Sequence, residues 1–186
     1  MSSELPCLST PRLLLRALEK HQADTLCTLA NGPKIADNTA SIPSPYTLQT
    51  AQDFIDGMQE KFRTAGLLSL GVHLRDTGEL IGIASLRINA LHHYGHLGGW
   101  TAADARNLGY ATEAATALMD YGFGKLGLHR VGSQCFSRNK ESARVMEKIG
   151  LQYEGCMRGA FLKNGVHEDM LVFATLREDW EFRLWG

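Results

Sequence analysis

Hydrophobic positions along the chain follow strand-like and helix-like patterns in turn. A mainly apolar run at 12–18 predicts a first strand. Apolar residues at helical spacing over 21–31, followed by a Gly-Pro pair, predict a short helix. The segment "IPSPYT" at 42–47 is expected to be a loop, because its two prolines suit neither a helix interior nor a central strand.

The second apolar stretch predicts a longer helix. From Thr50, apolar side chains recur at helical spacing as far as Phe62. Thr50 and Asp53 are the candidate N-terminal caps, and Gly66 is the expected stop.

The remaining pattern predicts alternating elements up to the C-terminal region. Strands are expected at 67–74, 80–86, 94–101, 129–136, 153–162 and 166–176, and helices at 110–125 and 140–150, the last capped by Asn139. No internal repeat or low-complexity linker interrupts the series. The sequence therefore predicts one mixed α/β domain over residues 1–186.

Composition narrows the function classes. Nineteen basic residues against twenty acidic ones leave a net charge of −1, so direct nucleic-acid binding is not expected. No apolar run approaches a membrane span and no signal peptide is visible, so we expect a cytoplasmic protein with no membrane partner. The four cysteines lack a C-x-x-C pair, so reduced thiols and no metal site are expected.

The stretch "ARNLGYATEA" at 105–114 lies between a predicted strand and an Ala-rich helix. It has neither a Walker motif nor the G-x-G-x-x-G dinucleotide fingerprint. A helix N-terminus offers unpaired amides and a positive dipole end, and the small Gly109 and Ala111 would let a pyrophosphate approach, with Arg106 beside it. The alternative is an ordinary glycine turn before a helix, and this loop alone does not decide between them.

A second segment, "FSRNKESARVMEKIGLQYEG" at 136–155, extends the pattern. Together the two segments resemble motifs of the GNAT superfamily of N-acetyltransferases. "LSTPRLLLRAL" at 8–18, "LGYATEA" and "REDW" at 177–180 are similar to its ribosomal-protein (RimJ/RimL-like) branch. The resemblance covers about residues 8 to 181. It implies a mostly antiparallel sheet of about seven strands, flanked by helices, with a parallel strand pair splayed at the cofactor site.

The resemblance also implies a site for acetyl-CoA as co-substrate. Backbone amides of the loop would bind the pyrophosphate, and main-chain groups on the preceding strand would pair with pantetheine. Asn139 would bond the pantetheine or acetyl region, although it is equally placed to cap the next helix. The implied cofactor-binding residues are Trp100, Thr101, Arg106, Asn107, Leu108, Gly109, Tyr110, Ala111, Thr112, Asn139 and Ser142.

The catalytic candidates are Ser142 and His96. Many superfamily members protonate the leaving thiolate with a Tyr where this chain has Met146, so the resemblance implies Ser142 as a substitute. His96 has a side chain of suitable pKa for a general base. Alternatively, His96 is merely a polar residue near a strand start, like His92 and His93.

Other acidic and aromatic positions bear on the same question. Glu113 and Asp169 are reserve candidates for the base, and capping and turn bonding are the more ordinary roles for them. Some ribosomal-protein acetyltransferases have a proposed base, a Glu, where this chain has Phe161. A ribosomal acceptor is therefore not implied by the resemblance alone.

The leading hypothesis is transfer of an acetyl group from acetyl-CoA to a primary amine by direct attack in a ternary complex. The acceptor is a protein N-terminal amine, such as that of a ribosomal protein, or a small amine, including an antibiotic or polyamine. A non-catalytic acyl-CoA-binding module is the alternative that Met146 leaves open. Aromatics in the segment 179–185 indicate a possible homodimer, although they could equally seal the core.

Overall fold

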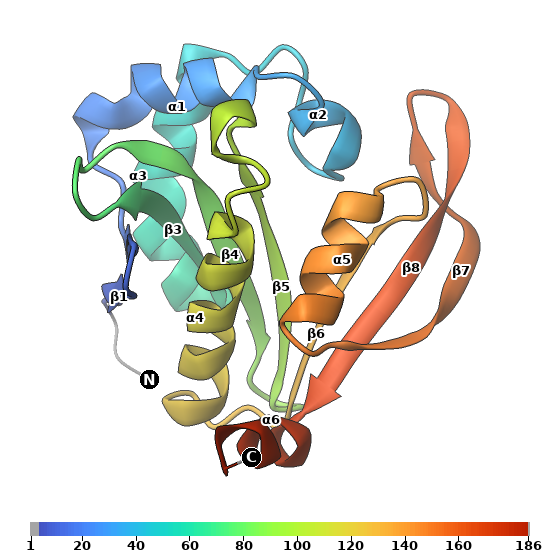
Figure 1. The fold of residues 1–186 in the computed structure, drawn as a ribbon. Coiled ribbons are helices and arrows are strands. Elements are labelled where there is room, and N and C mark those ends of the chain that lie inside the picture. Colours follow the sequence, from blue (N-terminus) through green and yellow to red (C-terminus); the bar gives the residue numbers. More distant parts are fainter. Residues whose placement is uncertain (1–3, 186) are drawn as a thin grey trace.

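An eight-stranded sheet in the order β1-β2-β3-β4-β5-β6-β8-β7 forms the centre of the molecule (Figure 1). The computed structural model describes the backbone of residues 4–185 and the side chains as far as residue 181. Neighbouring strands are antiparallel except for the parallel pair β5–β6. The strands are β1 (Leu8–Ser9), β2 (Leu13–Arg16), β3 (Leu67–Leu74), β4 (Leu80–Asn89), β5 (Tyr94–Thr101), β6 (Arg130–Phe136), β7 (Gln152–Lys163) and β8 (Val166–Leu176).

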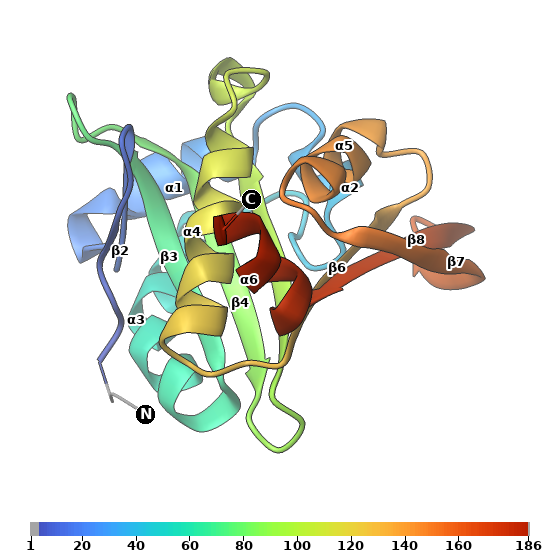
Figure 2. The ribbon, with the colours of Figure 1, turned by 60° about the horizontal axis from the view of Figure 1, so that its bottom comes forward.

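Helices cover both faces of this sheet (Figures 1 and 2). Buried side chains of α4 and α5 belong to one large apolar cluster with the sheet, and those of α1 and most of those of α3 belong to a second. The helices are α1 (Ala23–Ala30), α2 (Ile35–Asn38), α3 (Leu48–Ala65), α4 (Tyr110–Gly124), α5 (Lys140–Lys148) and α6 (Arg177–Trp185), with single 3₁₀ turns at Lys20–Gln22 and Ala103–Ala105.

The predicted fold class is confirmed: the sheet is mixed, mostly antiparallel, and contains a parallel pair. The sheet has eight strands where about seven were expected, because Leu8 and Ser9 form a short strand that pairs with β2. A strand of two residues is too short to show alternation in the sequence. Helix α2 was missed for the same reason, since it has only four residues.

The start of α3 differs from the prediction. Thr47 is the N-cap, and its hydroxyl oxygen accepts a hydrogen bond from the Thr50 amide at 3.1 Å. Thr50 and Asp53 therefore lie inside the helix, and the predicted cap was wrong. The cause is the exposed first turn, where Leu48 is 40% accessible and no apolar periodicity has begun. The predicted stop at Gly66 is confirmed by its left-handed φ of 62°.

Helix α6 packs against the end of α4 (Figure 2). The Trp180 ring stacks on Phe123, with 5.2 Å between ring centroids, and its indole N–H donates to Asp120 at 2.8 Å. Trp180 therefore seals the core of its own chain. The other two predicted aromatics, Phe182 and Trp185, lie outside the described side chains, and a homodimer stays a prediction.

Between residues 4 and 185, no helix combines the length and the apolar character that crossing a membrane requires.

Candidate active site

Strands β5 and β6 separate part-way along their length. The parallel ladder joins residues 94–96 to residues 130–132 and then ends. One further link follows, in which the Ser133 hydroxyl donates to the Leu97 carbonyl at 2.9 Å. Over residues 98–101, β5 pairs only with β4 on its other side. This open edge can therefore accept an extended ligand as an added strand.

The alternation of the β4–β5 ladder decides which main-chain groups face the open edge. The Ala102 amide donates to the Ile81 carbonyl on β4 at 2.8 Å. Main-chain groups of successive residues in an antiparallel strand point to opposite sides, so those of Trp100 face β4 as well. The groups of Gly99 and Thr101 face the open edge. Of the two residues predicted to pair with pantetheine, Thr101 directs its main-chain groups to the open edge and Trp100 directs them to β4, and the pairing itself stays a prediction.

The loop that follows β5 contains two left-handed residues, Asn107 with a φ of 62° and Gly109 with a φ of 84°. Gly109 is the N-cap of α4, and the first bond of the helix runs from the Glu113 amide to the Gly109 carbonyl at 3.0 Å. Within the described chain, the amides of residues 109–112 make no hydrogen bond to protein. Four adjacent donors at the positive end of a helix suit an anion such as pyrophosphate.

Arg106 braces this loop from one side. Its Nη2 donates to the Pro33 carbonyl at 2.7 Å, and its Nε donates to the Thr101 carbonyl at 3.3 Å. The guanidinium thus joins the loop to the end of β5 and to the connection between α1 and α2. Its predicted contact with phosphate stays a prediction.

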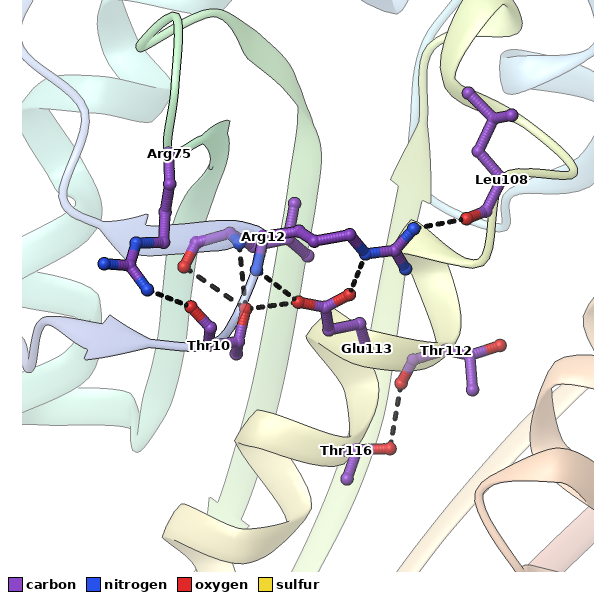
Figure 3. A network of polar contacts seen from close by, with 8 residues as sticks. Thr10, Arg12, Arg75, Leu108, Thr112, Glu113 and Thr116 are labelled. Atoms are coloured by element: carbon purple, nitrogen blue, oxygen red, sulfur yellow. Dashed lines mark hydrogen bonds and ion pairs between the residues drawn. The ribbon is translucent and has the colours of Figure 1, made fainter.

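A polar network braces the loop from the other side (Figure 3). One oxygen of the Glu113 carboxylate accepts from the Thr10 hydroxyl at 2.6 Å and from the Arg12 amide at 2.9 Å. The other oxygen accepts from Arg12 Nε at 2.7 Å, and Arg12 Nη1 donates to the Leu108 carbonyl at 2.9 Å. Burial opposes ionisation of Glu113, but the hydrogen bonds from Thr10 and Arg12 outweigh it and lower its pKa. Glu113 therefore serves structure, and not proton abstraction, in this arrangement.

Asn139 and Ser142 meet at the start of α5. The Asn139 side-chain oxygen accepts from the Ser142 amide at 3.1 Å, so the capping role expected for Asn139 is confirmed. Ser142 is half-buried, and burial raises the pKa of the nearby core thiol of Cys135. Met146 is 5% exposed and belongs to the core, so it offers no proton to a leaving group.

His96 lies where the β5–β6 ladder ends, opposite Gly132. Its Nδ1 is 3.2 Å from the Tyr94 hydroxyl oxygen. Gly132 makes room for that hydroxyl, because a Cβ added there would lie 3.0 Å from it. Burial, and then the nearby Arg87, lower the pKa of His96 below its ordinary value. The imidazole is therefore neutral at neutral pH and can accept a proton.

The other histidines of the same region lie apart from this site. His92 and His93 are exposed in the turn before β5. Among residues 4–185, no group of three or more His, Cys, Asp or Glu side chains is arranged to hold a metal ion.

Beyond the separated strands, α2 and the β7–β8 hairpin are joined through Arg138. Its guanidinium donates to the Asn38 side-chain oxygen and the Asp37 carbonyl, both at 2.7 Å, and to Glu168 at 2.8 Å. Phe161 faces Glu168 in the β7–β8 register and packs edge-to-face on Phe136 at 5.5 Å. We call this group of residues the hairpin wall.

Asp169 has a structural contact, since its carboxylate accepts from the Gly159 amide at 2.8 Å where the β7–β8 register is irregular. Sequence reasoning missed Arg12, Tyr94 and Arg138 as parts of the site. Arg12 had a signal, because it stands in the N-terminal motif at 8–18 and its partner Glu113 in the "LGYATEA" motif. Tyr94 and Arg138 had none.

Comparison with known proteins supports this arrangement. The model of the family described as the acetyltransferase (GNAT) domain matches residues 12–152. The chain belongs to this family and is an acetyltransferase.

Individual relatives are similar over nearly the whole chain. The uncharacterized N-acetyltransferase YnaD of Bacillus subtilis is 38% identical, covering 93% of this chain and 98% of its own. The ribosomal protein uS5-alanine N-acetyltransferase of Escherichia coli is 24% identical over 93% of this chain and 92% of its own. A Vibrio cholerae spermidine N-acetyltransferase, solved with CoA and spermine, has the same fold, with a TM-score of 0.79, 22% identity, and coverage of 92% and 99%. The resemblance to ribosomal-protein acetyltransferases is thereby confirmed.

Proposed function

We propose that this acetyltransferase transfers the acetyl group of acetyl-CoA to the primary amine at a protein N-terminus. The observation that best supports this proposal is the combination of an open β5 edge with amides at the start of α4 that bond no described protein group. An extended pantetheine arm and a pyrophosphate are the two parts of acetyl-CoA that such groups suit.

The residues of the loop fit this donor. Gly109 has a φ of 84°, and an added Cβ would lie 3.2 Å from the Arg12 guanidinium, so the position is reserved for glycine. The amides of Gly109, Tyr110, Ala111 and Thr112 would hold the pyrophosphate, while Asn107, Leu108 and Arg106 shape the loop. The main-chain groups of Gly99 and Thr101 would hold pantetheine. Asn139 would keep Ser142 at the acetyl end.

His96 and Ser142 would handle the protons. When its Nδ1–H donates to the Tyr94 oxygen, His96 keeps a lone pair on Nε2. That nitrogen accepts the proton of the attacking ammonium, directly or through water. An N–C bond then forms as the thioester C–S bond breaks, and Ser142 donates its hydroxyl proton to the departing sulfur. The nitrogen releases its second proton to solvent, which returns a proton to Ser142.

The charges of the hairpin wall favour a single amine over a polyamine. Glu168 of the hairpin wall is paired with Arg138 at 2.8 Å. Carboxylates already neutralised by arginine offer little to a second or third cationic centre. A protein N-terminus needs only one amine site and an open entrance for the chain behind it.

The experiment is a thiol-release assay with acetyl-CoA and two acceptor panels, one of short peptides with free N-termini and one of polyamines. Isothermal titration with CoA runs beside it. We expect CoA binding and acetylation of peptides at the α-amine, located by mass spectrometry. Absence of CoA binding at about 1 mM, an affinity worth only about 4 kcal/mol, would reject the donor site. Binding with acetylation of polyamines alone would reject the acceptor.

A further inference from the structure

The Thr10–Arg12–Glu113 network joins two segments about a hundred residues apart in sequence, as the separation of 101 between Arg12 and Glu113 records. It ties the start of β2 to the first turn of α4 and to the loop before it (Figure 3). The Arg12 guanidinium also lies over the Tyr110 ring, 4.6 Å from its centroid. The contacts of Arg12 therefore fall on Leu108, Tyr110 and Glu113, which flank or belong to the segment whose amides face the proposed pyrophosphate.

Arg12 controls the direction of one peptide group. Its Nη1 binds the Leu108 carbonyl at 2.9 Å. In a trans peptide the carbonyl and the next N–H point in opposite directions, so fixing the Leu108 carbonyl toward Arg12 fixes the Gly109 N–H away from it. Glycine accepts several conformations at similar free energy, so a peptide beside Gly109 would otherwise rotate easily.

The network also reduces the electrostatic repulsion between the Glu113 carboxylate and a bound pyrophosphate. Glu113 lies in the first turn of α4 and is only 16% exposed, where an unpaired carboxylate would repel a bound pyrophosphate. Its oxygens are turned to Thr10 and Arg12, so they do not occupy the amides of the helix start. The arginine cancels the charge of Glu113 while leaving those amides open.

We propose that Arg12 and Glu113 are positioning residues for acetyl-CoA: Glu113 holds Arg12, and Arg12 holds the Leu108–Gly109 peptide with its N–H toward the pyrophosphate. This inference rests on the proposed function of the loop. Neither side chain needs to touch the donor.

The test compares donors with and without a pyrophosphate. Calorimetric titration with CoA is carried out on three variants, Arg12→Gln, Arg12→Lys and Glu113→Gln. For each variant, the steady-state KM is then measured with acetyl-CoA and with acetyl-pantetheine, which lacks the pyrophosphate. We expect Arg12→Gln to weaken CoA binding by about tenfold or more, the scale of one charge-assisted hydrogen bond, and to leave the KM for acetyl-pantetheine unchanged. Arg12→Lys should restore little, because an ammonium lacks the fork that reaches both Glu113 and Leu108.

Arg75→Gln is the matched control, since Arg75 donates to the Thr10 carbonyl at 2.8 Å without touching the loop. It should leave CoA binding unchanged. Equal weakening of both donors by Arg12→Gln would overturn the proposal in favour of a general structural role. Tighter CoA binding by Glu113→Gln would also overturn it, because it would mean that the freed arginine binds phosphate directly. Should Arg12→Gln fail to fold, Glu113→Gln carries the same comparison.

A variant of the loop itself distinguishes failure of the proposed function from failure of the positioning role. If Gly109→Val leaves CoA binding intact, the proposed function of the loop fails. If Gly109→Val abolishes binding while the Arg12 and Glu113 variants match the wild type, only the positioning role fails.

Discussion

The proposed donor side and the proposed acceptor side of this site differ in the kind of group that forms them. The donor side consists of main-chain groups, namely the open edge of β5 and the amides before α4, and side chains hold these groups in place. The proposed acceptor side would instead consist of side chains, namely His96 on β5 and the residues of the hairpin wall. A main-chain site depends on backbone conformation, whereas a side-chain site depends on residue identity. The comparison explains why this chain reveals its donor more readily than its acceptor.

The largest expected effect tests the main-chain character of the donor side. Gly109→Val should weaken CoA binding by at least about 100-fold, or about 2.7 kcal/mol, because a β-branched residue at positive φ forces the loop to change shape. Gly78→Val is the control, since Gly78 has a φ of 73° in the turn between β3 and β4, with open space around it. Both variants should lose thermal stability, as measured by Tm, but only Gly109→Val should lose CoA binding. Loss of CoA binding in both would contradict a main-chain donor site.

The next effect separates chemistry from binding. Ser142→Ala should lower kcat by about 100-fold, the usual contribution of a positioned proton donor, while CoA affinity stays the same. The cap of α5 survives, because Asn139 accepts from the Ser142 amide and not from its hydroxyl. Stopped-flow acetyl transfer and calorimetry would check the two quantities. An unchanged kcat would remove Ser142 from the mechanism.

A variant on the acceptor side should change the KM for the acceptor and leave CoA binding unchanged. Arg138→Gln removes three hydrogen bonds that join α2 to the hairpin wall, so the KM for a peptide acceptor should rise about fivefold, and CoA binding should not change. Arg63→Gln is the control, because Arg63 is an exposed arginine paired with Glu60 at 2.9 Å on α3. A rise in the KM for acetyl-CoA instead would show that the two sides are not separate.

The smallest effect concerns pH. His96 must be neutral to accept a proton, and its pKa lies below the ordinary value of 6.5 because of burial and Arg87. The acid limb of log(kcat/KM) for one peptide acceptor should therefore fall below pH 6.5, and Arg87→Gln should move it upward by less than about one pH unit. His96→Gln should abolish this limb. If the acid limb of the pH profile is unchanged in both variants, the titrating group is not His96.

The parts that the sequence predicted are those encoded locally. A glycine before an Ala-rich helix and an Asn before an amphipathic helix identify two helix starts, and the family motifs place both beside the parallel pair. The parts that it did not predict depend on distant contacts. The pairing of Tyr94 with His96 needs the room that Gly132 leaves on the next strand, and the partners of Arg138 come from α2, which is too short to show a pattern.

Hydrogen exchange with and without CoA would locate the donor site on the backbone itself. We expect CoA to slow exchange at the amides of residues 109–112 and on the open edge of β5 at residues 99 and 101, with little change on β7. A hollow of about 1040 Å³ also lies along α4, lined by residues 6–11, Glu113, Asp120, Tyr121 and Lys125 among others. Slowed exchange at residues 6–9 and 120–126, with unchanged exchange at residues 109–112, would contradict the proposed donor site.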